Sequence, residues 1–352
     1  MAGKYISGLL VGIVFGYVVR KSRICFTGLI RDVFLMKDRF NIVLFSLIIV
    51  VEGTIYYILS VTSLIRIPLY LPPFSLISVA LGSFIFGFGA VMCSGCLTAT
   101  LVKCGDGRVS GWLYLLLFMI SDYFFSAGPG IGVSKRLRTA LVVDDDLAVR
   151  YSYAPLFIFI VLLALLLFII KRHSYESHSV SGRYSYTGIR NILFERSWPA
   201  VFNSVMTGAV LGAVFLISEM HGRHAGITIS SPVMSWVYYF TDPVETCGGC
   251  NPYDETLGWG SMLVIGIILG SFLTAALGGE LRIITVRKSE LFRGVIGALL
   301  MGAGAVWGLG CLLSNGLVGT AQLSVKSWYA LVFLTLGIWA STKIFFASYL
   351  RD

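Results

Sequence analysis

The chain has 352 residues, of which 57% are hydrophobic and only 13% are charged, and its formal net charge is +9 at pH 7. A soluble domain has about a quarter of its residues charged, so this composition, with a mean hydropathy of +0.84, excludes an ordinary water-soluble protein. The basic residues lie in short patches at the ends of apolar segments, which argues against nucleic-acid binding, and the seven cysteines of so long and apolar a chain exclude a secreted disulfide scaffold.

Apolar segments long enough to cross a membrane follow one another along the chain. A helical span needs roughly 20 mostly apolar residues, and this criterion predicts about nine spans, near residues 5–19, 41–63, 74–101, 110–128, 154–170, 201–219, 259–279, 293–317 and 328–347. The first segment has no small-residue cleavage pattern before Arg20 and Lys21, so we expect a retained span rather than a signal peptide. The chain is therefore predicted to be an all-α polytopic membrane protein with a single membrane domain.

The basic residues of the connections predict the orientation of the chain. The connection after the first span holds six lysines and arginines, and those near 171–196 and 282–293 are also basic, whereas the connection after the second span holds only Arg66. The positive-inside rule then places the N-terminus outside and the C-terminus in the cytoplasm of an inner membrane, although the basic loop around Lys135 departs from this trend.

The sequence contains an internal repeat. Residues 81–97, LGSFIFGFGAVMCSGCL, align without gaps to residues 296–312, IGALLMGAGAVWGLGCL, and eight of the 17 positions are identical. Weaker similarity extends the two copies to about 1–130 and 201–347, with a linking span at about 154–170. Five spans separate equivalent helices, which reverses their direction, so we expect an inverted-topology repeat with a site near the midplane where broken helices meet.

Two cysteine motifs are the strongest candidates for that site. Cys96 and Cys311 occupy equivalent repeat positions, each after a glycine and before a second helical stretch. A break there would direct the N-terminus of the following helix into the protein interior, where free N–H groups and the helix dipole suit an anion. A thiol adds a weak, soft hydrogen-bond donor for a sulfur atom. The candidate substrate-binding residues are Cys25, Cys96, Cys311, Gly95, Gly310, Thr98, Ser314 and Asn315.

The alternative for any one of these cysteines is that it packs as a small hydrophobic residue. This alternative is weaker for Cys96 and Cys311, which share a repeat position, than for Cys25, whose counterpart is Ala225.

Four motifs together resemble the YeeE/YedE sulfur-transport family, which includes bacterial thiosulfate uptake transporters. They are SRICFTGLIRD (22–32), SGCLTATLV (94–102), TGIRNILFERSWP (187–199) and GLGCLLSNGL (308–317). The resemblance implies an hourglass-like protein of about nine spans with short re-entrant helices. It further implies that Cys25, Cys96 and Cys311 match the family's functional cysteines, along which thiosulfate passes by S–H hydrogen bonds, and that a soluble TusA-like sulfurtransferase is a partner. The chain departs from the family pattern at Leu97 to Ala99 and at Leu312 to Leu313, which are more apolar than usual. The substrate therefore stays open among thiosulfate, sulfide, sulfite and selenium compounds.

A second function remains open because of two extra cysteine pairs. Cys93 forms a CxxC pair with Cys96, and Cys247 forms another with Cys250 in a polar loop. Such pairs are typical of a membrane thiol-disulfide oxidoreductase, provided that Cys93 and Cys96 lie on one face of a continuous helix. A local disulfide or an adventitious metal are the simpler interpretations of the loop pair. If the transporter interpretation holds, the chain is not an enzyme.

Charged residues inside the predicted spans are weaker candidates. Glu52 and Asp122 are hypotheses for proton coupling, and helix-to-helix hydrogen bonds would explain them equally. Lys4, Lys103 and Arg31 are hypotheses for drawing anions toward the protein, or simple anchors at the membrane surface. The sequence contains no nucleotide-binding motif, so we expect passive or ion-coupled transport with no cofactor and no metal.

Overall fold

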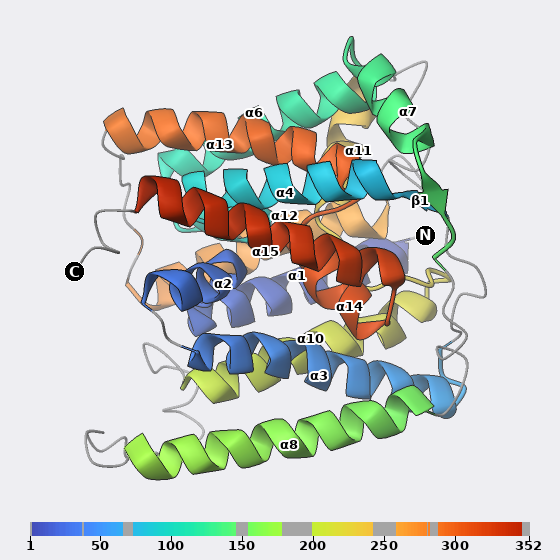
Figure 1. Ribbon diagram of the computed structural model, residues 1–352, viewed down its shortest axis with the longest axis vertical. Coiled ribbons are helices and arrows are strands. Elements are labelled where there is room, and N and C mark those ends of the chain that lie inside the picture. The colour runs from blue at the N-terminus through green and yellow to red at the C-terminus, as the bar shows by residue number, and fades with distance from the viewer. Residues whose placement is uncertain are drawn as a thin grey trace.

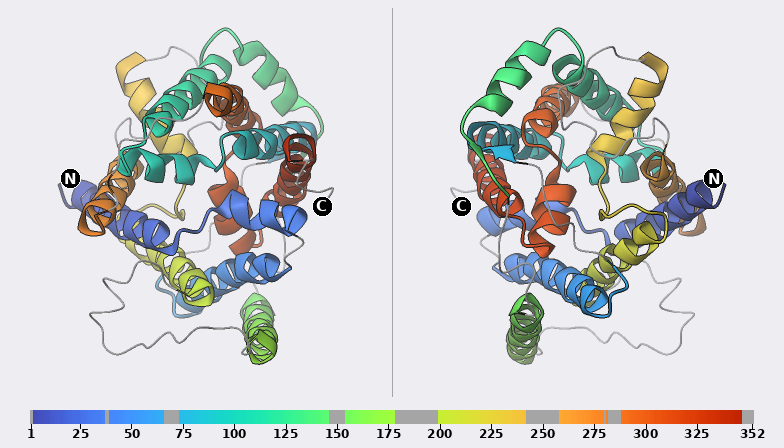
Figure 2. Two further views of the ribbon diagram at one scale, coloured as in Figure 1. Left: turned by 90° about the vertical axis from the view of Figure 1, so that its left-hand side faces the viewer. Right: turned by 90° about the vertical axis from the view of Figure 1, so that its right-hand side faces the viewer.

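The computed structural model describes residues 2–36, 39–65, 73–145, 154–177, 199–241, 258–279, 281 and 288–346. The protein is an all-α polytopic membrane protein in which long helices surround short, buried ones (Figures 1 and 2). The helices are α1 (Ala2–Ser22), α2 (Phe26–Leu35), α3 (Phe40–Val61), α4 (Leu76–Met92), α5 (Leu97–Gly105), α6 (Val109–Ser126), α7 (Ile131–Thr139), α8 (Ala154–Ser177), α10 (Ala200–Glu219), α11 (Ser230–Thr241), α12 (Trp259–Leu277), α13 (Lys288–Trp307), the π-helix η2 (Ser314–Val318), α14 (Gly319–Ala321) and α15 (Val325–Phe345). Two short strands, β1 (Phe74–Ser75) and β2 (Val142–Val143), pair antiparallel with Phe74 opposite Val143.

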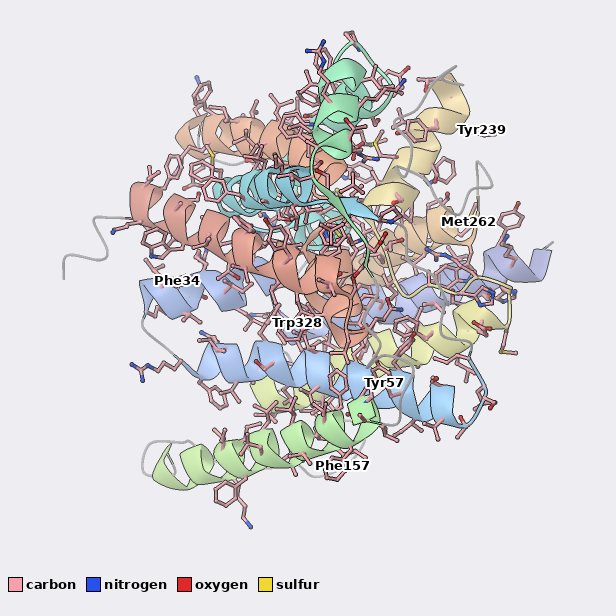
Figure 3. The ribbon with its side chains drawn as sticks, turned by 45° about the vertical axis from the view of Figure 1, so that its right-hand side comes forward. Phe34, Tyr57, Phe157, Tyr239, Met262 and Trp328 are labelled. Carbon is pink, nitrogen blue, oxygen red and sulfur yellow. The ribbon has the colours of Figure 1, made fainter. Side chains whose placement is uncertain are left out.

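Eight helical segments of the described ranges are long and apolar enough to cross a membrane. They coincide with eight of the nine predicted spans, and the remaining one, 5–19, lies within the 21-residue helix α1. Large apolar side chains cover the outside of the helices, as a lipid environment requires. Phe157, Tyr239 and Trp328 are 71%, 53% and 47% exposed (Figure 3).

Glycines allow two pairs of long helices to pack with their backbones in direct contact. On α1, Gly8, Gly12 and Gly16 face α12, and a Cβ atom on any of them would overlap a carbonyl oxygen of that helix. Successive glycines meet successive turns of α12, so the two helices run parallel. On α10, a Cβ on Gly208 would lie 2.8 Å from the carbonyl oxygen of Ile48 in α3. We call these contacts the glycine seams; small residues of this kind allow close helix packing inside membranes.

The helix pairings of one half of the chain recur in the other half. Helix α1 packs on α12 as α10 packs on α3, α4 packs on α15 as α13 packs on α6, and α4 and α13 pack on each other. Helix α8 lies at the periphery against α3, where the ring of Phe159 stacks on Tyr57 (Figure 1). These pairings agree with an internal repeat, and its boundaries at about 1–130 and 201–347 stay a prediction.

Two predicted spans are interrupted at equivalent positions. The segment predicted as 74–101 divides into α4 and α5, and the segment predicted as 293–317 divides after α13. The backbone conformation repeats at the two breaks: Ser94 and Leu309 have φ values of 55° and 54°, and Gly95 and Gly310 have 150° and 147°. Because side chains rarely adopt these last values, glycine is required at both positions. We call residues 93–96 and 308–311 the first and second hairpin.

Candidate functional site

Each of the three candidate cysteines lies immediately before a helix that starts inside the protein. Cys25 is the N-cap of α2 and Cys96 is the N-cap of α5, and neither uses its side chain as a cap. Cys311 directly precedes the helical residue Leu312. The predicted helix breaks are therefore present, and the thiols stand at helix N-termini, where backbone N–H groups lack intrahelical partners.

The three cysteines, 71 or more residues apart in sequence, converge in space. The thiol of Cys96 lies within electrostatic range of both Cys25 and Cys311. A Cβ atom on Gly95 would lie 3.6 Å from the Cys25 sulfur, which places Cys25 against the first hairpin. Cys25 is partly exposed, whereas Cys96 and Cys311 are each 1% exposed. The series thus leads from an accessible thiol to two buried ones.

Two polar residues that follow the second hairpin form hydrogen bonds back to it. The Cys311 N–H donates to Ser314 Oγ at 2.8 Å, and the Ser314 hydroxyl lies 3.6 Å from the Cys311 sulfur. Asn315 Nδ2 donates to the carbonyl of Gly308 at 2.8 Å. In the first half, the buried Thr98 hydroxyl lies beside the Cys96 thiol. Ser314 and Asn315 therefore hold the hairpin, while Thr98 stands next to the thiol itself.

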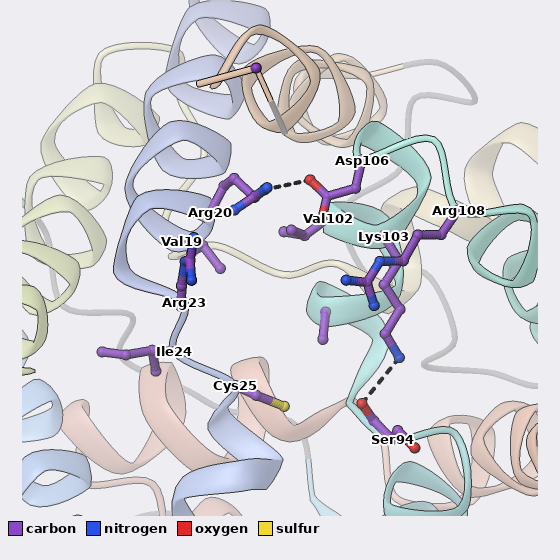
Figure 4. A pocket seen from close by; sticks show the side chains of 12 residues that line it. Val19, Arg20, Arg23, Ile24, Cys25, Ser94, Val102, Lys103, Asp106 and Arg108 are labelled. Atoms are coloured by element: carbon purple, nitrogen blue, oxygen red, sulfur yellow. Dashed lines mark hydrogen bonds and ion pairs between the residues drawn. The ribbon is translucent and has the colours of Figure 1, made fainter. Parts of the chain in front are cut away.

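A cavity of about 570 Å³ opens at Cys25 (Figure 4). Four basic side chains and one acidic side chain line the cavity and give it a net charge of +3. The basic residues are Arg20, Arg23, Lys103 and Arg108, and the acidic residue is Asp106. Arg20 forms an ion pair with Asp106, and the Lys103 ammonium donates to the carbonyls of Cys93 and Ser94 at 2.9 and 3.1 Å. This basic cavity is chemically suited to gather anions in front of Cys25.

A much smaller cavity of about 40 Å³ lies at the second hairpin, against Gly310. Its lining includes Asp122 of α6, Arg138 of α7 and Tyr238 of α11. Arg138 donates to the Val306 carbonyl at 2.6 Å. Burial lowers the pKa of Arg138 to about 10, although Asp122 opposes this shift, so the guanidinium stays charged at neutral pH. We call this group the Arg138 pocket; it places a second basic side chain at the other hairpin, together with the acidic Asp122.

Tyr238 keeps its proton in the Arg138 pocket. Burial raises the pKa of Tyr238 to about 12, and its hydroxyl donates to Ser126 Oγ at 2.7 Å. The residue is therefore a neutral hydrogen-bonding group at physiological pH.

Cys93 and Cys96 do not lie on one continuous helix. The helix is broken between them, so the condition under which the pair would share a helix face is not met. The Cys93 thiol instead donates to the Gly294 carbonyl of α13 at 3.1 Å. All five cysteines of the described segments are free thiols. Cys247 and Cys250 lie outside the described residues, as does most of the motif at 187–199.

Several charged residues of the site were not identified from the sequence as ligand-binding. The sequence pattern identifies Arg20, Arg23 and Arg138 only as orientation signals, and it assigns no role to Arg108 or Asp106. A basic cluster at a helix end next to a candidate cysteine is the signal that would have found Arg23. Of the proposed anion-attracting residues, Lys103 lines the basic cavity, whereas Arg31 pairs with Asp32 at 2.8 Å and lies over the Phe346 ring.

Comparison with known proteins identifies relatives over nearly the whole chain. A family model described as sulphur transport matches residues 21–340. The chain is 28% identical to the thiosulfate transporter TsuA of Escherichia coli (strain K12), over 97% of this chain and 95% of that protein. It is 27% identical to the thiosulfate transporter TsuA of Spirochaeta thermophila, over 97% of this chain and 98% of that protein.

Proposed function

Because the chain belongs to the sulphur transport family, we propose that it carries thiosulfate, or a closely related small sulfur-containing anion, through the membrane along Cys25, Cys96 and Cys311. The observation that carries this proposal is the convergence of the three thiols between the basic cavity and the Arg138 pocket. A transport path needs sites that are favourable enough to enter and shallow enough to leave. Neutral thiols, which are weak donors, provide such sites in series.

The remaining site residues have distinct proposed roles. Gly95 and Gly310 adopt the φ values that the two helix breaks require and leave the backbone there without a side chain, and Thr98 places a hydroxyl beside Cys96. The main role of Ser314 and Asn315 is to position the second hairpin, and they do not contact the anion at every step of its passage. The anion keeps all its bonds, and only hydrogen bonds change partner from one thiol to the next.

The proposed direction follows the basic residues at the chain's connections. Arg20 and Arg23 belong to the first basic connection, so the basic cavity opens to the cytoplasm in this proposal, and the Arg138 pocket lies on the outer side. The chain is then an inner-membrane protein with its N-terminus outside and its C-terminus in the cytoplasm. A soluble TusA-like sulfurtransferase is the proposed acceptor of the sulfur anion at the cytoplasmic cavity.

The oxidoreductase alternative has less support. Its inner pair requires Cys93 to reach Cys96, and the Cys93 thiol is engaged with Gly294 on a different helix. The relatives are named as transporters, which also favours transport over an enzymatic activity.

Uptake of labelled thiosulfate tests the proposal in cells that lack their own sulfate and thiosulfate importers. We expect uptake with the unmodified protein and its loss in Cys25→Ala, Cys96→Ala and Cys311→Ala. Cys104→Ala is the matched control, because Cys104 is also a buried free thiol on α5 but does not line the cavity. Uptake that persists in all three relay variants, or that depends on Cys247 and Cys250 instead, would contradict the proposal.

A further inference from the structure

Glu52 is a carboxylate buried inside a membrane-spanning helix. It lies near the middle of the 22-residue helix α3 and is 0% exposed. Neither carboxylate oxygen has a hydrogen-bond partner within the described part of the chain. An ionisable side chain in this position is costly and is usually retained for a function. A carboxylate without a partner in such surroundings is stable only with a proton bound.

Among the described residues, no charged side chain forms an ion pair with Glu52. Helix α3 packs against α2, α8, α10, α14 and η2. On α2, Arg31 and Asp32 pair with each other, and on α10, Glu219 pairs with His224 at 2.7 Å. The described side chains of η2 and α14 carry no charge.

The same face of α3 leads to the second hairpin. Tyr56 lies one turn after Glu52, and residues four apart share a helix face. The Tyr56 ring packs on Phe215 of α10, with 4.7 Å between ring centroids. Phe215 and Val318 both lie against Gly226, and Val318 is the last residue of η2, which begins three residues after Cys311. Helix α3, which carries Glu52, and the thiol path therefore both adjoin η2.

Buried hydroxyls next to α3 offer polar positions for a proton path. Ser204 and Thr207 of α10 are 0% and 1% exposed, and their hydroxyl groups have no partner in the described residues. Helix α10 packs directly on α3 along the glycine seam. Several unsatisfied polar groups in one buried region are a site where water or a proton can bind. The π-helix η2, which packs against α3, is a further sign of function, because such turns are frequent at functional sites.

We propose that Glu52 is a proton-binding site that couples a proton to each passage of the anion, which makes the protein a proton–anion symporter. This inference rests on the proposed function. Thiosulfate carries two negative charges, and the negative interior of the cell opposes the entry of each. A proton that binds to the Glu52 carboxylate from the outer side and leaves to the cytoplasm with the anion offsets one of these charges. The carboxylate returns to its starting state, so protons and charge balance over the cycle.

The purified protein in liposomes tests the proposal with two readouts. A pH-sensitive dye trapped inside reports proton entry when thiosulfate is added outside, with the membrane potential clamped by potassium and valinomycin. Exchange of labelled for unlabelled thiosulfate reports anion movement without net proton transport. Glu52→Gln mimics the protonated side chain at the same size, and Glu290→Gln, at an exposed position of α13, is the matched control.

We expect thiosulfate to acidify the interior with the unmodified protein and with Glu290→Gln. Glu52→Gln should abolish acidification and keep thiosulfate exchange. Exchange without acidification in the unmodified protein, or full acidification by Glu52→Gln, would overturn the inference while leaving the proposed function intact. Absence of exchange in the unmodified protein would instead overturn the proposed function, and this inference with it. If Glu52→Gln is inactive in exchange, Glu52→Asp decides: a shifted pH dependence of acidification supports the inference, and an unchanged one contradicts it.

Discussion

Replacement of Lys103 by methionine tests whether the basic cavity binds the transported anion. A Cβ on Gly95 would lie 3.7 Å from Lys103 Nζ and 3.6 Å from the Cys25 sulfur, so an anion bound between these two groups would contact both. Two unit charges roughly 4 Å apart attract each other by about 1 kcal/mol even in water. For a dianion the loss is about 2 kcal/mol, which corresponds to a KM for thiosulfate raised about 30-fold.

The assay is the initial rate at which labelled thiosulfate enters inside-out membrane vesicles, which present the basic cavity to the added anion, over a range of concentrations at fixed ionic strength. Lys103→Arg keeps the charge and should retain most of the affinity. Lys343→Met is the control, because Lys343 is a basic residue of α15 that lies over the Trp339 ring, away from the cavity. A KM for Lys103→Met equal to that of Lys343→Met would refute the placement of the anion beside Lys103.

Three further predictions concern the charges and the close packing of the helices. Asp106→Asn removes the acidic residue of the basic cavity and raises its net charge to +4, so it should lower the KM in the same inside-out vesicles by about threefold. An unchanged KM at low salt would contradict this role. Arg138→Gln removes the positive charge of the Arg138 side chain and should reduce uptake about tenfold between pH 6 and 9, where Arg138 is protonated. Uptake equal to that of the unmodified protein would exclude the Arg138 pocket from the path. Gly82→Ala places a Cβ against the Gly308 backbone and should destabilise the protein by about 3 kcal/mol, which is measured as a lower Tm in detergent. Gly3→Ala is the control and should leave Tm unchanged, because a Cβ at Gly3 meets open space.

The features that the sequence predicted share a local or repeated signal. Hydrophobic length identified the membrane helices, because every backbone group in lipid needs an internal partner. The repeat predicted that Gly95 and Gly310 would occupy equivalent breaks, and their matching φ values bear this out. The same breaks contradict a continuous helix from Cys93 to Cys96, because a glycine with φ near 150° cannot lie within an α-helix.

The features that the sequence did not predict depend on contacts between distant segments. The pairing of Arg20 with Asp106 joins residues 86 positions apart, and nothing in either segment specifies it. Lys103 reaches back to Ser94 only because α5 turns away from the first hairpin. The π-helix after Cys311 has no counterpart in α5, although the two segments are equivalent in the repeat. Tertiary packing decides these cases, and one sequence alone does not encode them in a readable pattern.

The glycine seams restrict how this protein can be redesigned. Where backbones touch, as between α1 and α12, neither helix can slide or tilt without collision. Larger residues at these contacts therefore cannot be used to change the shape of the transport path. The walls are consequently a fixed frame, and the adjustable parts are the short hairpins at 93–96 and 308–311. Engineering the protein for another anion, such as a selenium analogue, therefore reduces to substitutions in these two segments and in the charged residues beside them.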